Sequence, residues 1–206
     1  MIVKTLLLPD IHHKVDLADK IIKYVDADVV ICIGDLYDNF SDTPEMVSHS
    51  SEWINDFVKN PNHIFTYGNH DIMYCYPYRT LKCSGYEQWK SFIINDIVTR
   101  ETWNKLKWYH ILDNKWLLTH AGLHNHHIPE EIRILRGIEQ LTAIGEYLDK
   151  SIIDGLRDAA NNKPSWVLNA GYSRGGSQRY GGIVWNDHNR EHCPIIGLNQ
   201  LYGHSP

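Results

Sequence analysis

Residues 29–38 read VVICIGDLYD, a run of five apolar residues that ends at a glycine and an aspartate. A short run rich in β-branched residues is typical of a buried strand. Two further segments repeat this plan. Ile2–Leu8 stops at Pro9-Asp10, and Ile64–Tyr67 stops at Gly68-Asn69. The repetition predicts the strands of one buried parallel sheet, each followed by a polar loop.

Helix signals lie between these strands. Apolar residues recur at helical spacing from Val15 to Val25, and Thr43-Pro44 has the threonine cap and first-turn proline of a helix start. Strand, helix, strand, helix, strand is the order of right-handed βαβ units around a parallel sheet. The predicted class is therefore α/β.

The rest of the chain is less regular. A hairpin is predicted over residues 109–119, with its turn at Asp113-Asn114. Residues 129–161 have the pattern of a helical region, and short strands are predicted at Ile183–Trp185 and Leu201-Tyr202. Because no repeat or linker divides the sequence, we expect a single domain over residues 1–206.

The composition excludes several classes of protein. Hydrophobic residues make up 43% and charged residues 22% of the 206, as in an ordinary soluble globular protein. The net charge of -5 argues against a strongly basic nucleic-acid surface. The longest apolar run near the start, Leu6–Leu8, is too short for a signal peptide or a membrane span. We therefore expect no membrane partner. Four cysteines without CxxC spacing favour a reduced, cytoplasmic protein with no disulfides.

Polar residues follow the predicted strands at the points where each strand ends. In open α/β sheets the loops beyond the carboxyl ends of strands converge to form the ligand site. Imidazole nitrogens and carboxylate or amide oxygens together suit Mn, Fe or Zn. The chain has 13 histidines, and we expect His124, His126 and His127 to be solvated loop residues without a ligand role. The strand-end residues are Asp10, His12, Asp35, Asn69, His70, His120 and His204.

Five ordered blocks contain these residues. They are Asp10-Ile11-His12, Gly34–Asp38 (GDLYD), Gly68–Asp71 (GNHD), His120-Ala121-Gly122 and Gly203–Pro206 (GHSP). Together they resemble the calcineurin-like metallophosphoesterase superfamily, whose signature runs DxH, GDxxD, GNH[DE], a histidine after an apolar strand, and GHx[HP]. The resemblance spans nearly the whole chain.

The resemblance implies two divalent metal ions, with Mn the first choice and Fe, Zn, Ni or Mg as alternatives. Six ligands are implied: Asp10 and His12 for the first ion, Asn69, His120 and His204 for the second, and Asp35 as the bridge between them. A water activated between the two ions would attack phosphorus. His70 would then be the general acid for the leaving oxygen, and Asp38 would orient it.

The resemblance also implies an architecture. We expect a four-layer sandwich of two mixed β-sheets flanked by helices, with a helical insertion at about 129–161. His204 lies two residues from the end of the chain, so we expect the final C-terminal strands of the family to be missing.

The details of the motifs favour the serine/threonine protein phosphatase-like branch of the family, of the bacterial and phage type. That branch implies a phosphomonoester substrate, either a phosphoprotein or a small phosphoester. The IVWND segment at residues 183–187 resembles that branch's LLWxDP. The branch's phosphate-binding arginine is missing, because Asn39-Phe40 follow Asp38, and Arg174 is our candidate replacement. In this family a glycine usually follows the DxH motif, and this chain has His13 at that position.

Other functions stay open at this stage. The chain could be a phosphodiesterase or nuclease, or a hydrolase of dinucleoside polyphosphates. Nucleic acid would be a partner only under these alternatives. A binding scaffold without catalysis is a further alternative, although intact ligands and an intact acid argue against it. The sequence does not indicate the oligomeric state.

Overall fold

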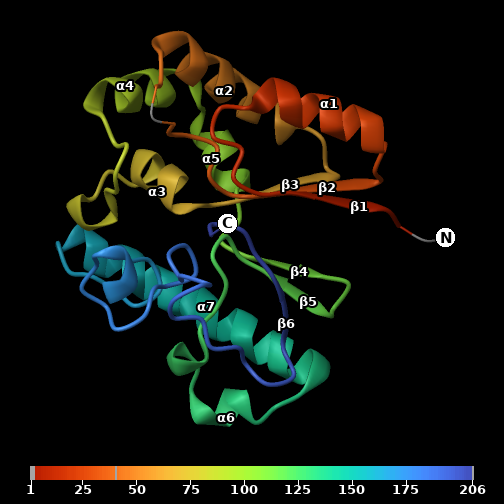
Figure 1. Ribbon diagram of the computed structural model, residues 1–206, viewed down its shortest axis with the longest axis vertical. Coiled ribbons are helices and arrows are strands. Elements are labelled where there is room, and N and C mark those ends of the chain that lie inside the picture. The colour runs from red at the N-terminus through yellow and green to blue at the C-terminus, as the bar shows by residue number, and fades with distance from the viewer. Residues whose placement is uncertain (1–2, 40, 206) are drawn as a thin grey trace. The chain divides into compact units, whose positions relative to one another are not determined.

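The computed structural model describes residues 3–39 and 41–205, and the chain divides into two compact units (Figure 1). The first unit runs to Pro77 and resumes over Lys82–Trp108, and the second holds Tyr78–Leu81 and the chain from Tyr109 onward. Ile2 of the first predicted strand, Phe40 next to the missing-arginine position and Pro206 of the last motif lie outside the described residues.

A parallel sheet is the centre of the first unit. Its strands lie in the order β1-β2-β3, and their bounds are β1 Thr5–Leu8, β2 Val29–Ile33 and β3 His63–Thr66. Ile31 in the central strand is fully buried, as a strand covered on both faces requires. The prediction of these strands from their apolar runs is confirmed, with boundaries that differ by up to three residues.

Helices α1 (Val15–Val25) and α2 (Pro44–Phe57) connect the strands and lie over one side of the sheet (Figure 1). Thr43 caps α2 as predicted, because its side chain accepts a hydrogen bond from the Met46 N–H at 3.3 Å. Phe57 packs edge-on against Phe65 of β3. The unit continues with α3 (Asn69–Cys75), α4 (Gln88–Ile97) and α5 (Arg100–Lys105).

The second unit contains a smaller, mixed sheet. β4 (His110–Leu112) pairs antiparallel with β5 (Trp116–Leu118), and β5 pairs parallel with β6 (Asn199–Leu201). Asp113 and Asn114 both have positive φ, the backbone that a tight hairpin turn requires, so the predicted turn is confirmed. The fold is thus α/β with two sheets flanked by helices, as expected, and the first sheet is parallel in all its described strands.

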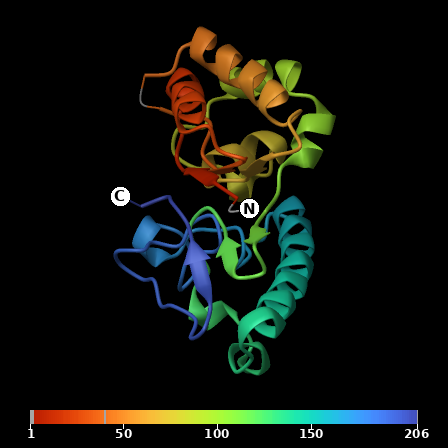
Figure 2. The ribbon, with the colours of Figure 1, turned by 90° about the vertical axis from the view of Figure 1, so that its right-hand side faces the viewer.

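The predicted helical region forms α6 (Glu130–Arg133) and α7 (Gly137–Ala160), with short helices η1 (Arg79–Leu81), η2 (Asn125–His127) and η3 (Tyr172–Arg174) elsewhere in the unit. Figure 2 shows α7 alongside the sheet. Tyr109 fixes this contact, because its hydroxyl donates to the Asp149 carboxylate at 2.9 Å. No helix formed by the described residues is long and apolar enough to cross a membrane.

Two sequence-based predictions are wrong in this unit. Residues 183–185 form a turn, because the N–H groups of Trp185 and Asn186 donate to the Gly182 carbonyl instead of a neighbouring strand. The histidines expected in solvent include His124, which is 4% exposed and stacks on Tyr180 at 4.0 Å. A buried strand and a buried turn can have the same apolar composition. Only their backbone hydrogen-bond partners distinguish them, and these are not visible in the sequence.

Candidate active site

The loops after β1 and β2 bring Asp10, His12 and Asp35 together in the first unit. One donor atom from each lies within 4.8 Å of the others. The Nδ1–H of His12 donates to the Tyr37 carbonyl at 2.9 Å, so its Nε2, 3.8 Å from Asp35 Oδ2, is the nitrogen left to bind a cation. This oriented set of nitrogen and oxygen donors fits a transition-metal ion.

The backbone at these positions is unusual. Asp10, His12, Asp35 and Asp38 all have φ between 42° and 67°, in the left-handed region that non-glycine residues seldom adopt. Each such residue costs on the order of 1–3 kcal/mol, and residues of this kind concentrate at functional sites. His13, which stands at the position of the glycine in the DxHG pattern, also lies in this left-handed region, with φ 63°. The loops are therefore held in place by surrounding contacts.

Asp71 supplies much of that restraint. Its carboxylate is fully buried and accepts hydrogen bonds from the N–H groups of Asp35, Leu36 and Gly68, each at 2.8 Å. It thereby ties the loop after β2 to the start of α3. Gly68 is required there, because a Cβ would lie 2.1 Å from Asp35 Oδ1. The sequence analysis assigned Asp71 no role, although an acidic residue three positions after Gly68 is a helix-capping signal.

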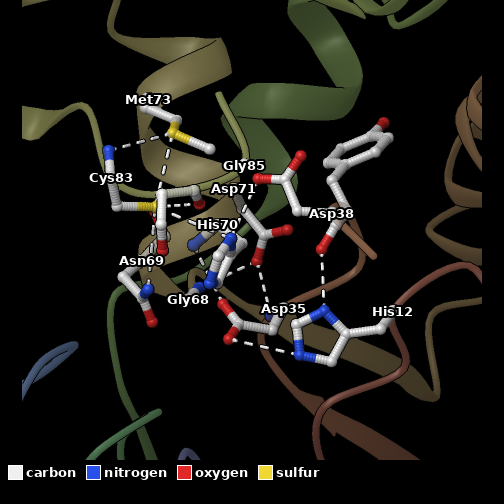
Figure 3. A network of polar contacts seen from close by, with 12 residues as sticks. His12, Asp35, Asp38, Gly68, Asn69, His70, Asp71, Met73, Cys83 and Gly85 are labelled. Carbon is white, nitrogen blue, oxygen red and sulfur yellow. Dashed lines mark hydrogen bonds and ion pairs between the residues drawn. The ribbon is translucent and has the colours of Figure 1, made fainter. Parts of the chain in front are cut away.

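Asp38 and His70 form a hydrogen-bonded pair beside this group (Figure 3). The Nδ1–H of His70 donates to Asp38 Oδ2 at 2.9 Å, and the backbone N–H of His70 donates to Asp35 Oδ1 at 3.0 Å. Burial by itself would lower the pKa of His70, but hydrogen bonds with Asp38 and Cys83 and the charge of Asp35 raise it to about 11. These contacts favour the doubly protonated form of the imidazole in the metal-free protein.

The other oxygen of Asp38 is held by two side chains that the sequence analysis did not identify. The Tyr74 hydroxyl donates to Oδ1 at 2.7 Å, and the Lys90 ammonium donates to it at 3.0 Å. Burial alone would raise the pKa of Asp38, but hydrogen bonds from His70, Tyr74 and Lys90 bring it below its ordinary value. Asp38 is thus a carboxylate with a fixed direction.

Lys90 is itself only 2% exposed and also donates to Asp42 and to the Gly85 carbonyl. His13 completes this layer, since its Nε2 accepts from the Asp38 N–H at 3.2 Å. Burial lowers the pKa of His13, which keeps the ring neutral and able to accept that bond.

A pocket of about 480 Å³ opens beside the Asp38–His70 pair. His12, Asp38 and His70 line it, and so do Lys14 and Lys90. Its volume is within the range of small-molecule sites. The first unit therefore combines a group of candidate metal donors, a hydrogen-bonded histidine–aspartate pair and a pocket.

In the second unit His120 and His204 lie together at the ends of β5 and β6. His120 Nε2 is 3.0 Å from His204 Nδ1, and the Gly203 N–H donates to the His120 carbonyl at 2.8 Å. His120 is fully buried, and His204 has φ 71°. Asn69, the remaining predicted ligand, is buried at the start of α3 in the first unit.

Arg174 lies in η3 of the second unit. Its Nε donates to Asp187 Oδ2 at 2.8 Å and its Nη2 donates to Ser205 Oγ at 2.6 Å. The guanidinium that we expected to bind phosphate is thus already engaged by a buried carboxylate.

Comparison with known proteins identifies the sequence pattern. Residues 3–206 match the profile of a family described as calcineurin-like phosphoesterase. No curated protein sequence matches the chain.

Similar solved structures resemble parts of the chain. A Saccharomyces cerevisiae protein serine/threonine phosphatase with similarity to human PP5 is 20% identical (TM-score 0.39, 59% of this chain and 38% of that one). A Sphaerobacter thermophilus metallophosphoesterase is 16% identical (TM-score 0.42, 59% of this chain and 48% of that one). A putative diadenosine tetraphosphatase is 19% identical (TM-score 0.40, 63% of this chain and 59% of that one). The chain matches less than two thirds of the length of each of these proteins.

Proposed function

Because the chain belongs to the calcineurin-like phosphoesterase family, we propose that it is a metal-dependent phosphomonoesterase of the protein phosphatase-like kind. Its substrate would be a phosphoprotein or a small phosphoester. The observation that carries the proposal is the Asp38–His70 pair, which lines a pocket beside the Asp10, His12 and Asp35 donor group.

Two divalent ions are part of this proposal. Asp10, His12 and Asp35 would supply the donors for the first ion, and the motifs of the sequence suggest Asn69, His120 and His204 for the second. When bound, such ions activate a water and offset the charge of the phosphoryl group. Manganese is the proposed metal, because the ligand set mixes nitrogen and oxygen whereas Mg²⁺ prefers oxygen alone.

His70 would give a proton to the leaving oxygen of the ester. Its Nδ1–H is engaged by Asp38, so the Nε2–H is the proton available for transfer. Asp38 would keep the ring in position and stabilise its charge, and Tyr74 and Lys90 would in turn hold Asp38. A positioned acid of this kind accelerates a reaction by about 10²–10⁴-fold.

Lys14 is the proposed phosphate contact in this pocket. It is exposed at the start of α1 and lines the pocket with His12 and His70, whereas Lys90 is buried between two carboxylates. Lys14→Ala should raise KM for a phosphomonoester about 10- to 100-fold, the effect of losing one charge-assisted hydrogen bond. Lys20→Ala, on the exposed face of the same helix, is the matched control. Arg174→Ala in the same assay tests the phosphate contact expected from the sequence, and its bond with Asp187 predicts a smaller change in KM than Lys14→Ala gives.

The alternatives are separated by a substrate panel with Mn, Mg, Zn or Ni. It compares p-nitrophenyl phosphate, bis(p-nitrophenyl) phosphate, a phosphopeptide, a dinucleoside polyphosphate and single-stranded DNA, with Asp35→Asn, which should lose the metal, as the control for contaminating activity. Faster cleavage of a monoester supports the proposal, in agreement with a net charge of -5 that disfavours a polyanion. Faster cleavage of the bis ester, the dinucleotide or DNA would favour those functions instead, and no cleavage with any metal would indicate a scaffold.

A further inference from the structure

Cys83 lies against the catalytic pair of the proposed function. Its Sγ is 3.6 Å from His70 Nδ1, the same nitrogen that lies 2.9 Å from Asp38 Oδ2 (Figure 3). Three donor atoms, one from each of Asp38, His70 and Cys83, lie within 4.8 Å of one another. The segment that precedes α4 supplies the cysteine, α3 supplies the histidine, and the loop after β2 supplies the aspartate.

This arrangement is not that of a cysteine nucleophile. In a cysteine–histidine–carboxylate triad the thiol and the carboxylate contact opposite nitrogens of the ring, so that the ring can take the thiol proton while the carboxylate orients it and stabilises its charge. Here Cys83 and Asp38 both face Nδ1. A thiol, an imidazole nitrogen and a carboxylate oxygen that face one common point are a ligand set for a metal ion.

We propose that Asp38, His70 and Cys83 form an additional, inhibitory site for a thiophilic divalent cation such as Zn²⁺. The site shares no residue with the six ligands proposed for the two catalytic ions. Tyr74 and Lys90 hold Asp38 by Oδ1, which leaves Oδ2 directed at the site. Solvent would supply the fourth ligand, since His70 lines the open pocket.

The distances suit zinc. With Zn–N of about 2.1 Å, Zn–S of about 2.3 Å and tetrahedral angles, the nitrogen and sulfur ligands lie about 3.6 Å apart, and nitrogen and oxygen about 3.4 Å apart. The observed nitrogen–sulfur distance is 3.6 Å, and the nitrogen–oxygen distance of 2.9 Å must open by about 0.5 Å. A rotation of the His70 imidazole, which lines the pocket, would supply that opening.

Binding would change the chemistry of His70. The cation replaces the Nδ1 proton and the Cys83 thiol proton, and both protons are released to solvent. The ring then holds a proton only at Nε2 and would have to become an imidazolate to donate it, so it no longer acts as an acid. This consequence, although not the site itself, rests on the proposed function. Because a thiolate selects zinc over manganese or magnesium, excess zinc should inhibit an enzyme that manganese activates.

Cobalt(II) tests the site without any activity measurement. Added to the full chain, it should give the near-ultraviolet thiolate-to-cobalt absorption. The absorption should be retained in Cys75→Ser, a half-buried cysteine on α3, and lost in Cys83→Ser and in Cys83→Ala. Absence of the band in the unchanged protein at saturating cobalt, or its persistence in both Cys83 variants, would overturn the proposal.

Zinc titration of the manganese-loaded enzyme tests the consequence, with each variant compared with its own zinc-free rate. Cys83→Ser should raise the zinc concentration for half-inhibition by about 100-fold or more. Loss of a residue that only supports a metal ligand already lowers metal affinity by about 10- to 100-fold, and Cys83 would be a ligand itself. Cys75→Ser should match the unchanged protein. Equal inhibition of the Cys83 and Cys75 variants would refute inhibition through this site. If no metal supports hydrolysis, the proposed function fails, while the cobalt absorption still decides whether the site exists.

Discussion

The carboxylate of Asp71 accepts a hydrogen bond from the backbone N–H of Asp35 at 2.8 Å, so one buried acid holds the backbone of another. Asp35 has φ 58°, a conformation that its loop would not keep without such a contact. The restraint directs the Asp35 side chain toward Asp10 and His12. The geometry of the proposed metal ligands in the first unit thus depends on a residue that is not itself a proposed ligand.

Asp71→Asn should destabilise the protein by about 1–3 kcal/mol, because the new amide keeps one acceptor oxygen but turns its NH2 group toward a backbone N–H that needs an acceptor. Urea unfolding of the metal-free protein measures this loss. Asp96→Asn, on the exposed face of α4, is the matched control and should change stability by less than about 0.5 kcal/mol. Equal stability of the two variants would show that Asp71 does not restrain the loops.

Lys90→Met should also destabilise the fold, by about 3–5 kcal/mol, since it leaves Asp38 and Asp42 as buried charges without their cation. Denaturant unfolding checks the size of the effect. The additional substitution Asp42→Asn should restore part of the stability, because it removes the charge of the carboxylate that has lost its lysine, whereas Asp38 keeps its hydrogen bonds with His70 and Tyr74. Lys105→Met, an exposed lysine paired with Glu101 on α5, is the control and should cost about 1 kcal/mol or less.

Asp35→Asn and His70→Asn should fail in different ways. Loss of the proposed bridging carboxylate should lower the manganese content of the purified protein. His70→Asn should keep the metal and lower kcat by about 10²–10⁴-fold. That second effect should shrink for p-nitrophenyl phosphate, whose leaving group hardly needs a proton. A metal-free His70→Asn protein would contradict the role of His70 as an acid.

His127 predicts an acid-sensitive second unit. Its ring stacks on Trp166, its Nε2–H donates to the Gly181 carbonyl at 3.0 Å, and burial lowers its pKa from 6.5 to about 4. Between these values the unfolded chain binds a proton that the folded chain does not. The contribution of His127 is therefore complete above pH 6.5 and is lost as the pH falls toward 4, at up to about 1.4 kcal/mol per pH unit.

Chemical unfolding measured from pH 7 to pH 4 tests this prediction. His127→Gln retains a donor for the Gly181 carbonyl but does not titrate, so its stability should fall less steeply than that of the unchanged protein. His126→Gln, at the exposed neighbouring position, should retain the steeper dependence. Parallel curves for His127→Gln and the unchanged protein would be inconsistent with a neutral, buried His127.

The sequence by itself determined what depends on neighbours along the chain. Val29–Ile33 is a strand because its β-branched run can be read locally, and Thr43-Pro44 starts a helix because a cap acts within one turn. The ordered motifs were likewise visible, and the family profile confirms the resemblance that they carry. Local composition failed at Ile183–Trp185, where an apolar run forms a buried turn.

The tertiary structure alone decided which side chains support those motifs. Lys90 reaches Asp38 across 52 positions of sequence, and Cys83 reaches His70 Nδ1 from a separate segment. Neither residue lies in a motif, and neither contact leaves a periodic or compositional trace. The physical reason is that a buried charge needs an opposite charge or a hydrogen-bond partner close in space, and the path of the chain determines which distant residue provides it.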